Sequence, residues 1–408
     1  MQTELADFIR DTPEGKEADA ILRKCVHCGF CNATCPTYQL LGDELDGPRG
    51  RIYLVKQVLE GVAPTSKTRL HLDRCLSCRS CESTCPSGVA YGRLADIGRG
   101  IVEVKVPRGF WEGIRRQVLG AFLPRTGLFS FALLLGWLTK SFLPESLQRT
   151  IPEKPKAAGT WPAPRHRRRM LVLAGCVQPA LAPAINAAAA RVLDRNGISL
   201  IEAPGAACCG AVRFHLNEQD AGREDMRALI DAWWPSIERG EIEAIVMTAS
   251  GCGSFVKEFV HHLHADAGYR QKAERISAMT KDLSEVVPEH AIEKKTGSGR
   301  VAFQSPCSLQ HGQQLRGNVE ALLRKAGYEL VPVADGHLCC GSAGTYSILQ
   351  PELSGQLRER KLSALAAGGP GVIATANIGC LAHLQAGTRA PPSGTRVRIV
   401  HWIELLDE

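Results

Sequence analysis

The sequence has few aromatic residues and no long apolar run. Phe, Trp and Tyr make up 6% of the 408 residues, so no series of stacking side chains accompanies the net charge of +7, and we expect no nucleic-acid binding. The most apolar stretch, residues 127–138, is shorter than the roughly twenty residues that a membrane-spanning helix needs. The first residues show no basic start followed by an apolar run, so a secretory signal peptide is not expected.

Two common signatures of catalysis are also missing. No glycine-rich dinucleotide fingerprint follows an expected strand, so the sequence predicts no flavin or nicotinamide site. No Ser, His and Asp residues are arranged as in a nucleophilic triad. We therefore expect no catalytic residue in this chain and place substrate chemistry on another chain.

The positive charge is concentrated in one segment. Between Val106 and Met170 there are twelve Lys and Arg residues and three Glu residues, so this segment has a net charge of +9 and the rest of the chain has a net charge of −2. It also contains the apolar stretch 127–138, which Arg125 and Lys140 flank. Two interpretations of that stretch stay open: a segment in the membrane interface, within reach of a quinone, or a helix buried against the core or a partner subunit.

Cysteine is unusually abundant, with sixteen residues. Without a signal peptide we do not expect disulfides, and short fixed spacings indicate metal binding. Eight cysteines lie in two runs, residues 25–36 and 75–86, and both runs fit C-x₂-C-x₂-C-x₃-C-P without a mismatch. Soft thiolates at this spacing are typical of bacterial 4Fe–4S ferredoxins, whose function is electron transfer. Two zinc sites are the alternative, but a zinc site would explain neither the third cysteine at the same two-residue spacing nor the final Cys-Pro of each run.

In two-cluster ferredoxins the fourth cysteine of each run binds the other cluster. This rule predicts two cofactor sites, the first with Cys25, Cys28, Cys31 and Cys85, the second with Cys75, Cys78, Cys81 and Cys35. Nearby cations could raise the cluster potentials, although solvated surface charge explains each of them equally well. These cations are Arg49, Arg51, Lys56, Arg74 and Arg79.

The other eight cysteines form a duplicated pattern in the C-terminal half. Matching cysteines of the two copies lie 131, 131, 131 and 128 residues apart, which indicates two structural repeats. The copies are Cys176, Cys208, Cys209 and Cys252, then Cys307, Cys339, Cys340 and Cys380. We interpret both sets as candidate further metal or iron–sulfur sites, with ordinary buried cysteine as the alternative.

Strand-like and helix-like stretches alternate in each copy, which predicts a mostly parallel α/β sheet. Expected strands are 170–174, 198–202, 244–248, 301–304, 329–333 and 372–375, and expected helices are 179–196 and 318–326. The predicted fold is therefore α+β and multi-domain, a mostly helical two-cluster ferredoxin domain followed by two α/β repeats. The predicted limits are 1–105 for the ferredoxin-type domain, 106–169 for the connector, 170–290 for repeat 1 and 300–408 for repeat 2.

The Cys-Cys-Gly sequences at 208–210 and 339–341 resemble the cysteine-rich CCG domain. Together with the two ferredoxin runs they make the whole chain resemble the iron–sulfur subunit of bacterial glycolate oxidase, as do PRGRIYLVKQVLEG, CLSCRSCESTCPSGVAYGRL, CCGSAGTYSILQPELS and ASGCGSFVKEF. The small subunit of anaerobic glycerol-3-phosphate dehydrogenase has the same layout. The resemblance implies an FAD-containing partner that oxidises glycolate, or also D-lactate, and a quinone or other membrane electron acceptor. It also implies a cytoplasmic location with peripheral contact on the inner face of the membrane.

The sequence departs from the full CCG pattern, which has five cysteines per repeat. Ala249 and Asn377 stand where the first cysteine of a final C-x-x-C would be. This departure counts against the double-cubane chemistry of heterodisulfide reductase, although four thiolates can still hold a metal ion or one cluster. A thiol–disulfide enzyme of that type and a zinc-stabilised scaffold are the two alternatives from other functional classes.

Overall fold

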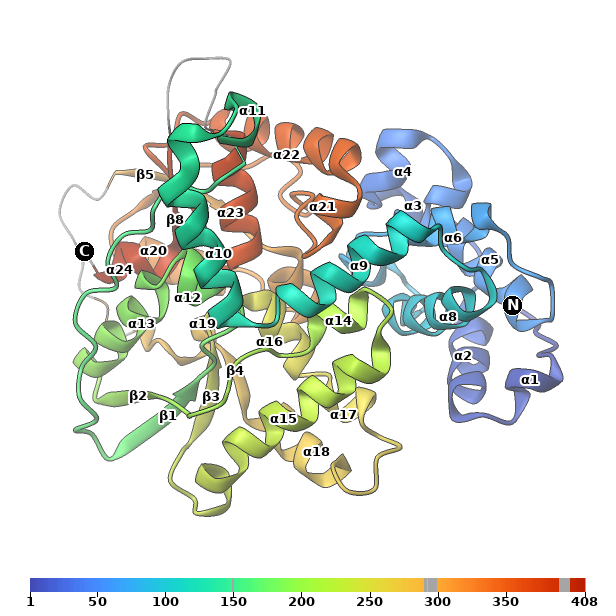
Figure 1. Cartoon of the computed structure of the whole chain (residues 1–408), viewed down its shortest axis with the longest axis horizontal. Helices are drawn as coiled ribbons and strands as arrows, with labels where there is room; N and C mark the ends of the chain where they lie inside the picture. Colours follow the sequence, from blue (N-terminus) through green and yellow to red (C-terminus); the bar gives the residue numbers. More distant parts are fainter. Residues whose placement is uncertain (149, 290–291, 293–298, 389–396, 408) are drawn as a thin grey trace. The chain divides into compact units, whose positions relative to one another are not determined.

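The computed structural model describes residues 1–148, 150–289, 292, 299–388 and 397–407. The chain divides into two compact units (Figure 1). The first contains Met1–Gln117 and His337–Leu357, and the second contains Val118–Gly336 and Arg358–Glu408. The segment His337–Leu357, which carries the second Cys-Cys-Gly sequence, thus packs within the same unit as both ferredoxin runs.

The first unit is helical. Three of its helices begin with a proline, at Pro13, Pro36 and Pro48, where the missing N–H costs nothing. Besides the beginnings of α9 (Phe110–Phe122) and α22 (Pro351–Ala366), its helices are α1 (Asp7–Arg10), α2 (Pro13–Lys24), α3 (Phe30–Ala33), α4 (Pro36–Leu41), η1 (Glu44–Asp46), α5 (Pro48–Leu59), α6 (Ser66–Asp73), α7 (Ser80–Thr84), α8 (Tyr91–Lys105) and α21 (Tyr346–Leu349).

The core of this unit forms where α5, α8 and α2 meet. Leu22, Leu59 and Leu94 come from these three helices and are fully buried. Gly98 on α8 allows α5 to approach closely, because a Cβ atom there would lie 2.4 Å from a methyl group of Val55. This packing fixes α5 and α8, which carry most of the side chains around the second cysteine run.

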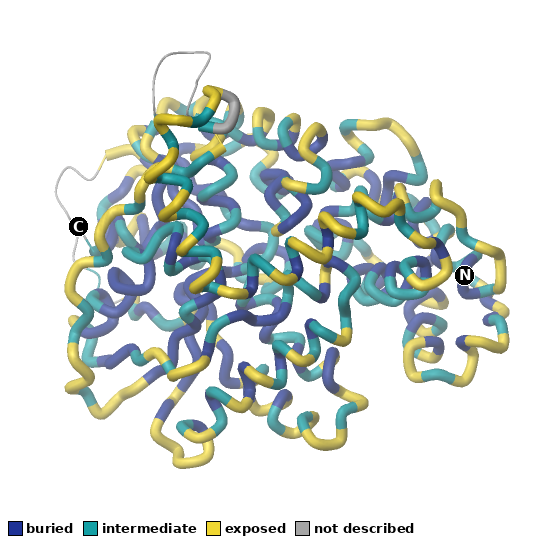
Figure 2. The backbone as a smooth tube through the Cα atoms, viewed as in Figure 1, coloured by how far each residue is buried: buried dark blue, intermediate teal, exposed yellow. Residues whose placement is uncertain are grey.

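The second unit contains two four-stranded parallel sheets. Their strand orders are β2-β1-β3-β4 and β6-β5-β7-β8, so the two repeats have the same topology. The first sheet consists of β1 (Arg168–Val172), β2 (Ile198–Glu202), β3 (Ala244–Met247) and β4 (Thr280–Asp282), and the second of β5 (Arg300–Gln304), β6 (Glu329–Leu330), β7 (Val372–Thr375) and β8 (Arg398–His401). The inner strands are mostly buried (Figure 2). The predicted fold class, a helical ferredoxin part and two parallel α/β repeats, is confirmed.

Helices cover these sheets and connect their strands. Trp233 of α15 (Gln219–Glu238) and Phe259 of α17 (Phe259–His262) are fully buried in one hydrophobic cluster of the first repeat, which also contains Ile245 of β3. The helices of the second unit are α10 (Thr126–Thr139), η2 (Lys140–Phe142), α11 (Glu145–Gln148), α12 (Gln178–Leu181), α13 (Ala184–Arg195), α14 (Ala211–His215), α15 (Gln219–Glu238), α16 (Ser250–Val256), α17 (Phe259–His262), α18 (Arg270–Met279), α19 (Leu283–Val286), η4 (Ser308–Gly312), α20 (Asn318–Lys325), α23 (Ile378–Gly387) and α24 (Trp402–Asp407).

Some elements differ from the sequence-based expectation. The helix expected over 179–196 is two helices, α12 and α13, because Pro183 lies at the junction and cannot continue the first one. The fourth strand of each sheet, β4 and β8, was not predicted. Both are short, and β4 has the polar sequence TKD, which gives no apolar pattern.

The apolar stretch 127–138 forms α10, and none of its residues is buried. Leu128, Phe131, Leu135 and Leu138 recur at helical spacing and are all exposed. In the described part of the chain, no single helix has the length and apolar character to cross a membrane. Helix α9 and residues 126–142 together have that length and apolar character, but the chain bends by 105° between them.

Candidate functional site

The first predicted cysteine set surrounds one cavity in the first unit. Cys25, Cys28, Cys31 and Cys85 all line it, together with Cys81, so the wall takes thiols from both runs. Burial and the neighbouring thiols of Cys25, Cys85 and Cys28 raise the pKa of Cys31 to about 11. These sulfur atoms are therefore close enough to repel one another's negative charge, which a bound cation or cluster would relieve.

Both cysteine runs adopt the same local backbone. In the first run His27 and Gly29 have φ angles of 59° and 89°, and in the second Ser77 and Arg79 have 51° and 58°. Three of these four residues are not glycine, and left-handed backbone costs such residues about 1–2 kcal/mol. The strain turns the chain between successive cysteines, and short helices α3 and α7 then begin after Gly29 and Arg79. Strained backbone of this kind is concentrated at functional sites.

The second predicted set also comes together. Burial and the thiols of Cys78, Cys75 and Cys35, with Glu82, raise the pKa of Cys81 well above its usual value. Cys35 of the first run thus lies among three cysteines of the second run. Cys35 begins α4 and Cys85 ends α7, so helix ends position the two cysteines that each run contributes to the other set.

Polar side chains enclose this second set. Arg51 on α5 is 1% exposed, and its Nη1 lies 3.9 Å from the Cys35 sulfur. The hydroxyl of Thr37 lies 3.3 Å from the same sulfur. The Tyr91 hydroxyl donates to the Cys75 sulfur at 3.4 Å, and Arg99 donates to the Cys75 carbonyl at 2.6 Å. Burial raises the pKa of the Cys75 thiol, but the positive charges of Arg51 and Arg99 and the Tyr91 hydroxyl outweigh it and bring that pKa below its usual value.

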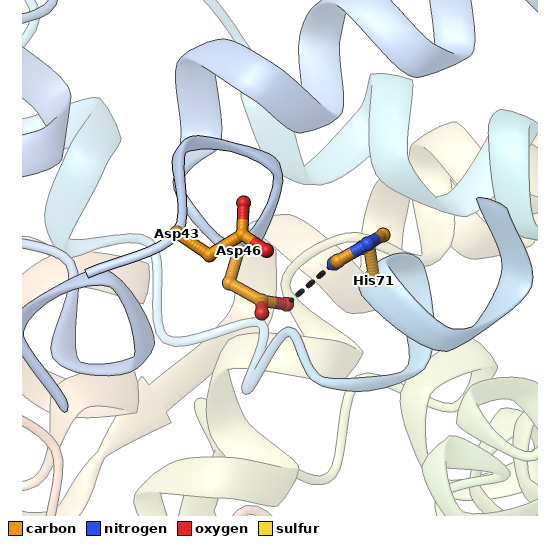
Figure 3. A group of neighbouring side chains, drawn as sticks. All are labelled: Asp43, Asp46 and His71. Atoms are coloured by element: carbon orange, nitrogen blue, oxygen red, sulfur yellow. Dashed lines mark hydrogen bonds and ion pairs between the residues drawn. The ribbon is translucent and has the colours of Figure 1, made fainter. Parts of the chain in front are cut away.

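A buried carboxylate holds Arg51 in place. Asp46 is fully buried and accepts from Arg74 at 2.8 Å and from Arg51 at 3.4 Å. His71 Nδ1 lies 3.0 Å from the same carboxylate (Figure 3). Asp43, Asp46 and His71 could by distance hold a metal ion. The two guanidinium groups already neutralise Asp46, however, so this group orients Arg51 instead.

The first set has a more open environment. Cys28 is exposed, as are its neighbours Val26 and Phe30, at 69% and 62%. Arg49 is the nearby cation, but it is partly exposed and its Nε pairs with Glu44 at 2.6 Å. Each set therefore offers four thiols, but the surroundings of the two sets differ. Four soft sulfur donors with N–H and O–H groups around them fit a 4Fe–4S cluster, which supplies one-electron transfer when bound.

The cysteines of the first CCG repeat form one group in the second unit. Cys208 accepts hydrogen bonds from Cys176 and Cys209, which lower the pKa of its thiol well below the usual value. The pKa values of Cys176 and Cys209 are raised, first by their hydrogen bonds with Cys208 and then by burial. Cys209 also bonds to Cys252, so all four predicted sulfur ligands are linked in one chain.

The glycine of each Cys-Cys-Gly sequence has a defined role. Gly210 has a φ of 87°, and its N–H donates to the Cys208 sulfur at 3.4 Å. Gly341 has a φ of 89°, and its N–H donates to the Cys339 sulfur at the same distance. A Cβ atom at either glycine would lie 2.6 or 2.7 Å from a backbone carbonyl oxygen. Both repeats thus require glycine there to present the preceding cysteine pair.

The cysteines of the second repeat belong to both units. Cys339 and Cys340 are buried in the first unit, whereas Cys307 and Cys380 belong to the second. Asn377, at a position where the CCG pattern has cysteine, donates from Nδ2 to the Cys380 sulfur at 3.7 Å. Its Oδ1 accepts from the Gly251 N–H at 3.0 Å, so it joins the two repeats. Ala249, the other replaced position, begins α16.

Sequence reasoning missed several polar residues of the second set. Arg51 and Arg74 were named as candidates, but Thr37, Tyr91, Arg99 and Asp46 were not. Their signal is weak because each is an ordinary residue in a helical pattern. The sequence DGPRGR places Asp46 five residues before Arg51, across a Gly-Pro turn, and this is a signal for the Asp46–Arg51 pair. No local feature of the sequence marks Tyr91 or Arg99.

Family models match most of the chain. A 4Fe–4S dicluster domain matches residues 21–89. A cysteine-rich domain matches twice, at residues 170–257 and 301–385. These matches cover both ferredoxin runs and both repeats, and they support iron–sulfur clusters as the cofactors.

Two relatives are similar over nearly the whole length, and a third is similar over about half of this chain. The glycolate oxidase iron–sulfur subunit of Escherichia coli is 53% identical over 410 residues, covering 100% of this chain and 99% of that protein. The probable glycolate oxidase iron–sulfur subunit of Bacillus subtilis is 30% identical, covering 95% and 94%. Lactate utilization protein A of Geobacillus kaustophilus is 26% identical over 55% of this chain and 92% of its own length. The chain belongs to the family of glycolate oxidase iron–sulfur subunits and is an iron–sulfur electron-transfer subunit of a dehydrogenase.

Proposed function

We propose that this chain accepts electrons from the reduced flavin of a partner subunit that oxidises glycolate to glyoxylate, and delivers them to a quinone-level acceptor. The observation that carries the proposal is the pair of four-thiol sets in the first unit, each built from both cysteine runs. Full-length similarity to a glycolate oxidase subunit supplies the reaction. D-lactate is a second candidate substrate, because a lactate utilization protein is among the relatives.

The proposed ligand sets are those that the spacing predicts. Cys25, Cys28, Cys31 and Cys85 hold one cluster, and Cys35, Cys75, Cys78 and Cys81 hold the other. The supporting observation is the mutual influence of these thiols within each set. The proposal assigns residues 1–105 to this domain, 106–169 to the connector, and 170–290 and 300–408 to the two repeats.

The cysteine-rich repeats are proposed to hold further iron–sulfur sites. In repeat 1 the hydrogen-bonded chain through Cys208 and Cys209 already gathers four sulfur donors. The corresponding set Cys307, Cys339, Cys340 and Cys380 is proposed from the constant offset between the repeats. Iron analysis of anaerobically purified protein tests this: about eight iron atoms per chain would confine clusters to the first domain, whereas a higher number supports the repeats.

A catalytic partner and its substrate can be identified together. The complex is purified anaerobically from the native host through a tag on this chain, and the co-purifying flavoprotein is identified by mass spectrometry. Glycolate, D-lactate and glycerol 3-phosphate are then added separately, and bleaching of the iron–sulfur absorbance is recorded. We expect bleaching with glycolate. Bleaching with glycerol 3-phosphate alone, or no flavoprotein in the complex, would refute the proposed reaction.

The exposed face of α10 is proposed to contact the membrane. Phe131 and Leu138 lie on its apolar stripe at 58% and 62% exposure, and Arg125 and Lys140 at its two ends suit anionic headgroups. We expect the complex to co-sediment with vesicles containing anionic lipid, and the double variant Phe131→Glu/Leu138→Glu to stay in the supernatant. Val104→Glu, at an apolar residue of α8 that is 86% exposed, is the control. A different result would assign the stripe to a subunit interface: the wild type does not bind vesicles, and the double variant loses the flavoprotein subunit.

A further inference from the structure

The two thiol sets of the first unit differ in the charged groups around them. At the second set, Arg51 and Arg99 are buried near Cys35 and Cys75. Arg51 shares the single carboxylate of Asp46 with Arg74, so its charge is only partly balanced. At the first set, Arg49 is already paired with Glu44 and is open to water, which screens its charge. A buried, incompletely balanced positive charge stabilises added negative charge more strongly than a screened ion pair does.

Hydrogen-bond donors reinforce this difference. The Tyr91 hydroxyl donates directly to the Cys75 sulfur, and the ring of Tyr91 is buried. Arg51 also lies within donor distance of the Cys35 sulfur. Hydrogen bonds to cluster sulfur atoms and nearby cations favour the reduced, more negative state of an iron–sulfur cluster.

A second tyrosine reaches the same place from a distant part of the sequence. Tyr346 begins α21 in the segment His337–Leu357 and is 7% exposed. Its electrostatic neighbours include Arg51, Cys75 and Cys339. Its hydroxyl is buried and has no hydrogen-bond partner among the described residues. An unsatisfied buried hydroxyl is costly, so a donor in this position indicates an acceptor that is not a protein atom.

We propose that Tyr346, together with Tyr91 and Arg51, donates to and stabilises the reduced form of the group held by Cys35, Cys75, Cys78 and Cys81, and makes this the more easily reduced of the two sites. The inference rests on the proposed function, in which both cysteine sets hold 4Fe–4S clusters. Each reduction adds one electron and moves no proton.

The test measures two potentials in the full-length protein. Wild type, Tyr91→Phe and Tyr346→Phe are titrated anaerobically with dithionite and mediators, and cluster reduction is followed by EPR. Each substitution removes one oxygen atom and keeps the ring. We expect each to lower the higher of the two potentials by about 59 mV, which is a tenfold change for a one-electron couple. The lower potential should not move.

Matched controls separate this effect from general perturbation. Tyr53→Phe alters a half-exposed tyrosine on α5, whose ring centre lies 6.3 Å from that of His27 at the first set, and should leave the higher potential unchanged. Arg51→Lys keeps the charge and Arg51→Met removes it, so only the second should lower the higher potential strongly. If Arg51→Met does not fold because buried Asp46 loses one of its two arginine partners, the tyrosine variants decide.

Two outcomes overturn the inference. One is that neither tyrosine variant shifts a potential, and the other is that the lower potential falls while the higher does not. Failure of the proposed function looks different: the wild type would then lack two 4Fe–4S signals, or Cys75→Ser would keep both.

Discussion

Replacing Gly210 by alanine tests how the Cys-Cys-Gly sequence positions its cysteines. The residue has a φ of 87°, which alanine adopts only with strain. A Cβ atom there would also lie 2.6 Å from the carbonyl oxygen of Gly222 on α15, and a backbone atom cannot rotate away. The backbone of Gly210 would have to move, and its N–H would be drawn from the Cys208 sulfur.

The expected magnitude has two parts. Left-handed backbone at a residue other than glycine costs about 1–2 kcal/mol. Forcing an extra carbon into a packed contact costs about 1–3 kcal/mol more. We therefore expect Gly210→Ala to lower the free energy of unfolding by about 2–5 kcal/mol. Gly240→Ala is the matched control in the same unit, because Gly240 has a φ of 65° and open space around it.

Urea unfolding followed by tryptophan fluorescence measures both variants. Trp233 and Trp402 are fully buried in this unit, so their emission reports its unfolding. Gly240→Ala should show the backbone cost alone, about 1–2 kcal/mol. Equal losses for the two variants would refute the reasoning, because the close approach to Gly222 would then contribute nothing. Iron analysis of Gly210→Ala adds a second readout, since a displaced Cys208 should reduce any iron bound by repeat 1.

Three further predictions concern buried groups. Burial raises the pKa of Asp282 from 3.8 to about 6, so the charged carboxylate destabilises the folded state as pH rises through that range. In urea unfolding at a series of pH values, Asp282→Asn should be more stable than wild type by up to about 3 kcal/mol at pH 8 and equal to it below pH ~4. Burial lowers the pKa of His401 from 6.5 to about 4, so the unfolded chain binds a proton more readily than the folded one between these pH values. The free energy of unfolding of the wild type should therefore fall by up to about 3 kcal/mol as pH falls from 6.5 to 4, and that of His401→Gln should fall clearly less in the same assay. Gly98→Ala should lower the free energy of unfolding by about 1–3 kcal/mol because the new methyl group displaces Val55. Thermal unfolding of the double variant Gly98→Ala/Val55→Ala should show recovery of most of this loss, and no recovery would contradict the packing argument.

The sequence predicts best what is repeated or periodic. The rule for two-cluster ferredoxins grouped Cys85 with the first cysteine run, and Cys85 lines the same cavity as that run. The constant offset between copies predicted two repeats, and the two sheets have one topology. It could not predict β4 or β8, because short edge strands have too few apolar residues for a pattern. Tyr346 was beyond reach for another reason: its neighbours Arg51 and Cys75 are far away in sequence, and no local feature marks a long-range contact.

The exchange of one cysteine between the two ferredoxin runs also has a consequence for cofactor assembly. Each four-thiol set is incomplete until both runs have folded, since Cys35 and Cys85 lie with the opposite triplets. Filling either set therefore orders the loop that supplies the last thiol of the other. Assembly should approach an all-or-none process, in which chains carry both clusters or neither, and damage to one cluster would prepare the loss of its neighbour.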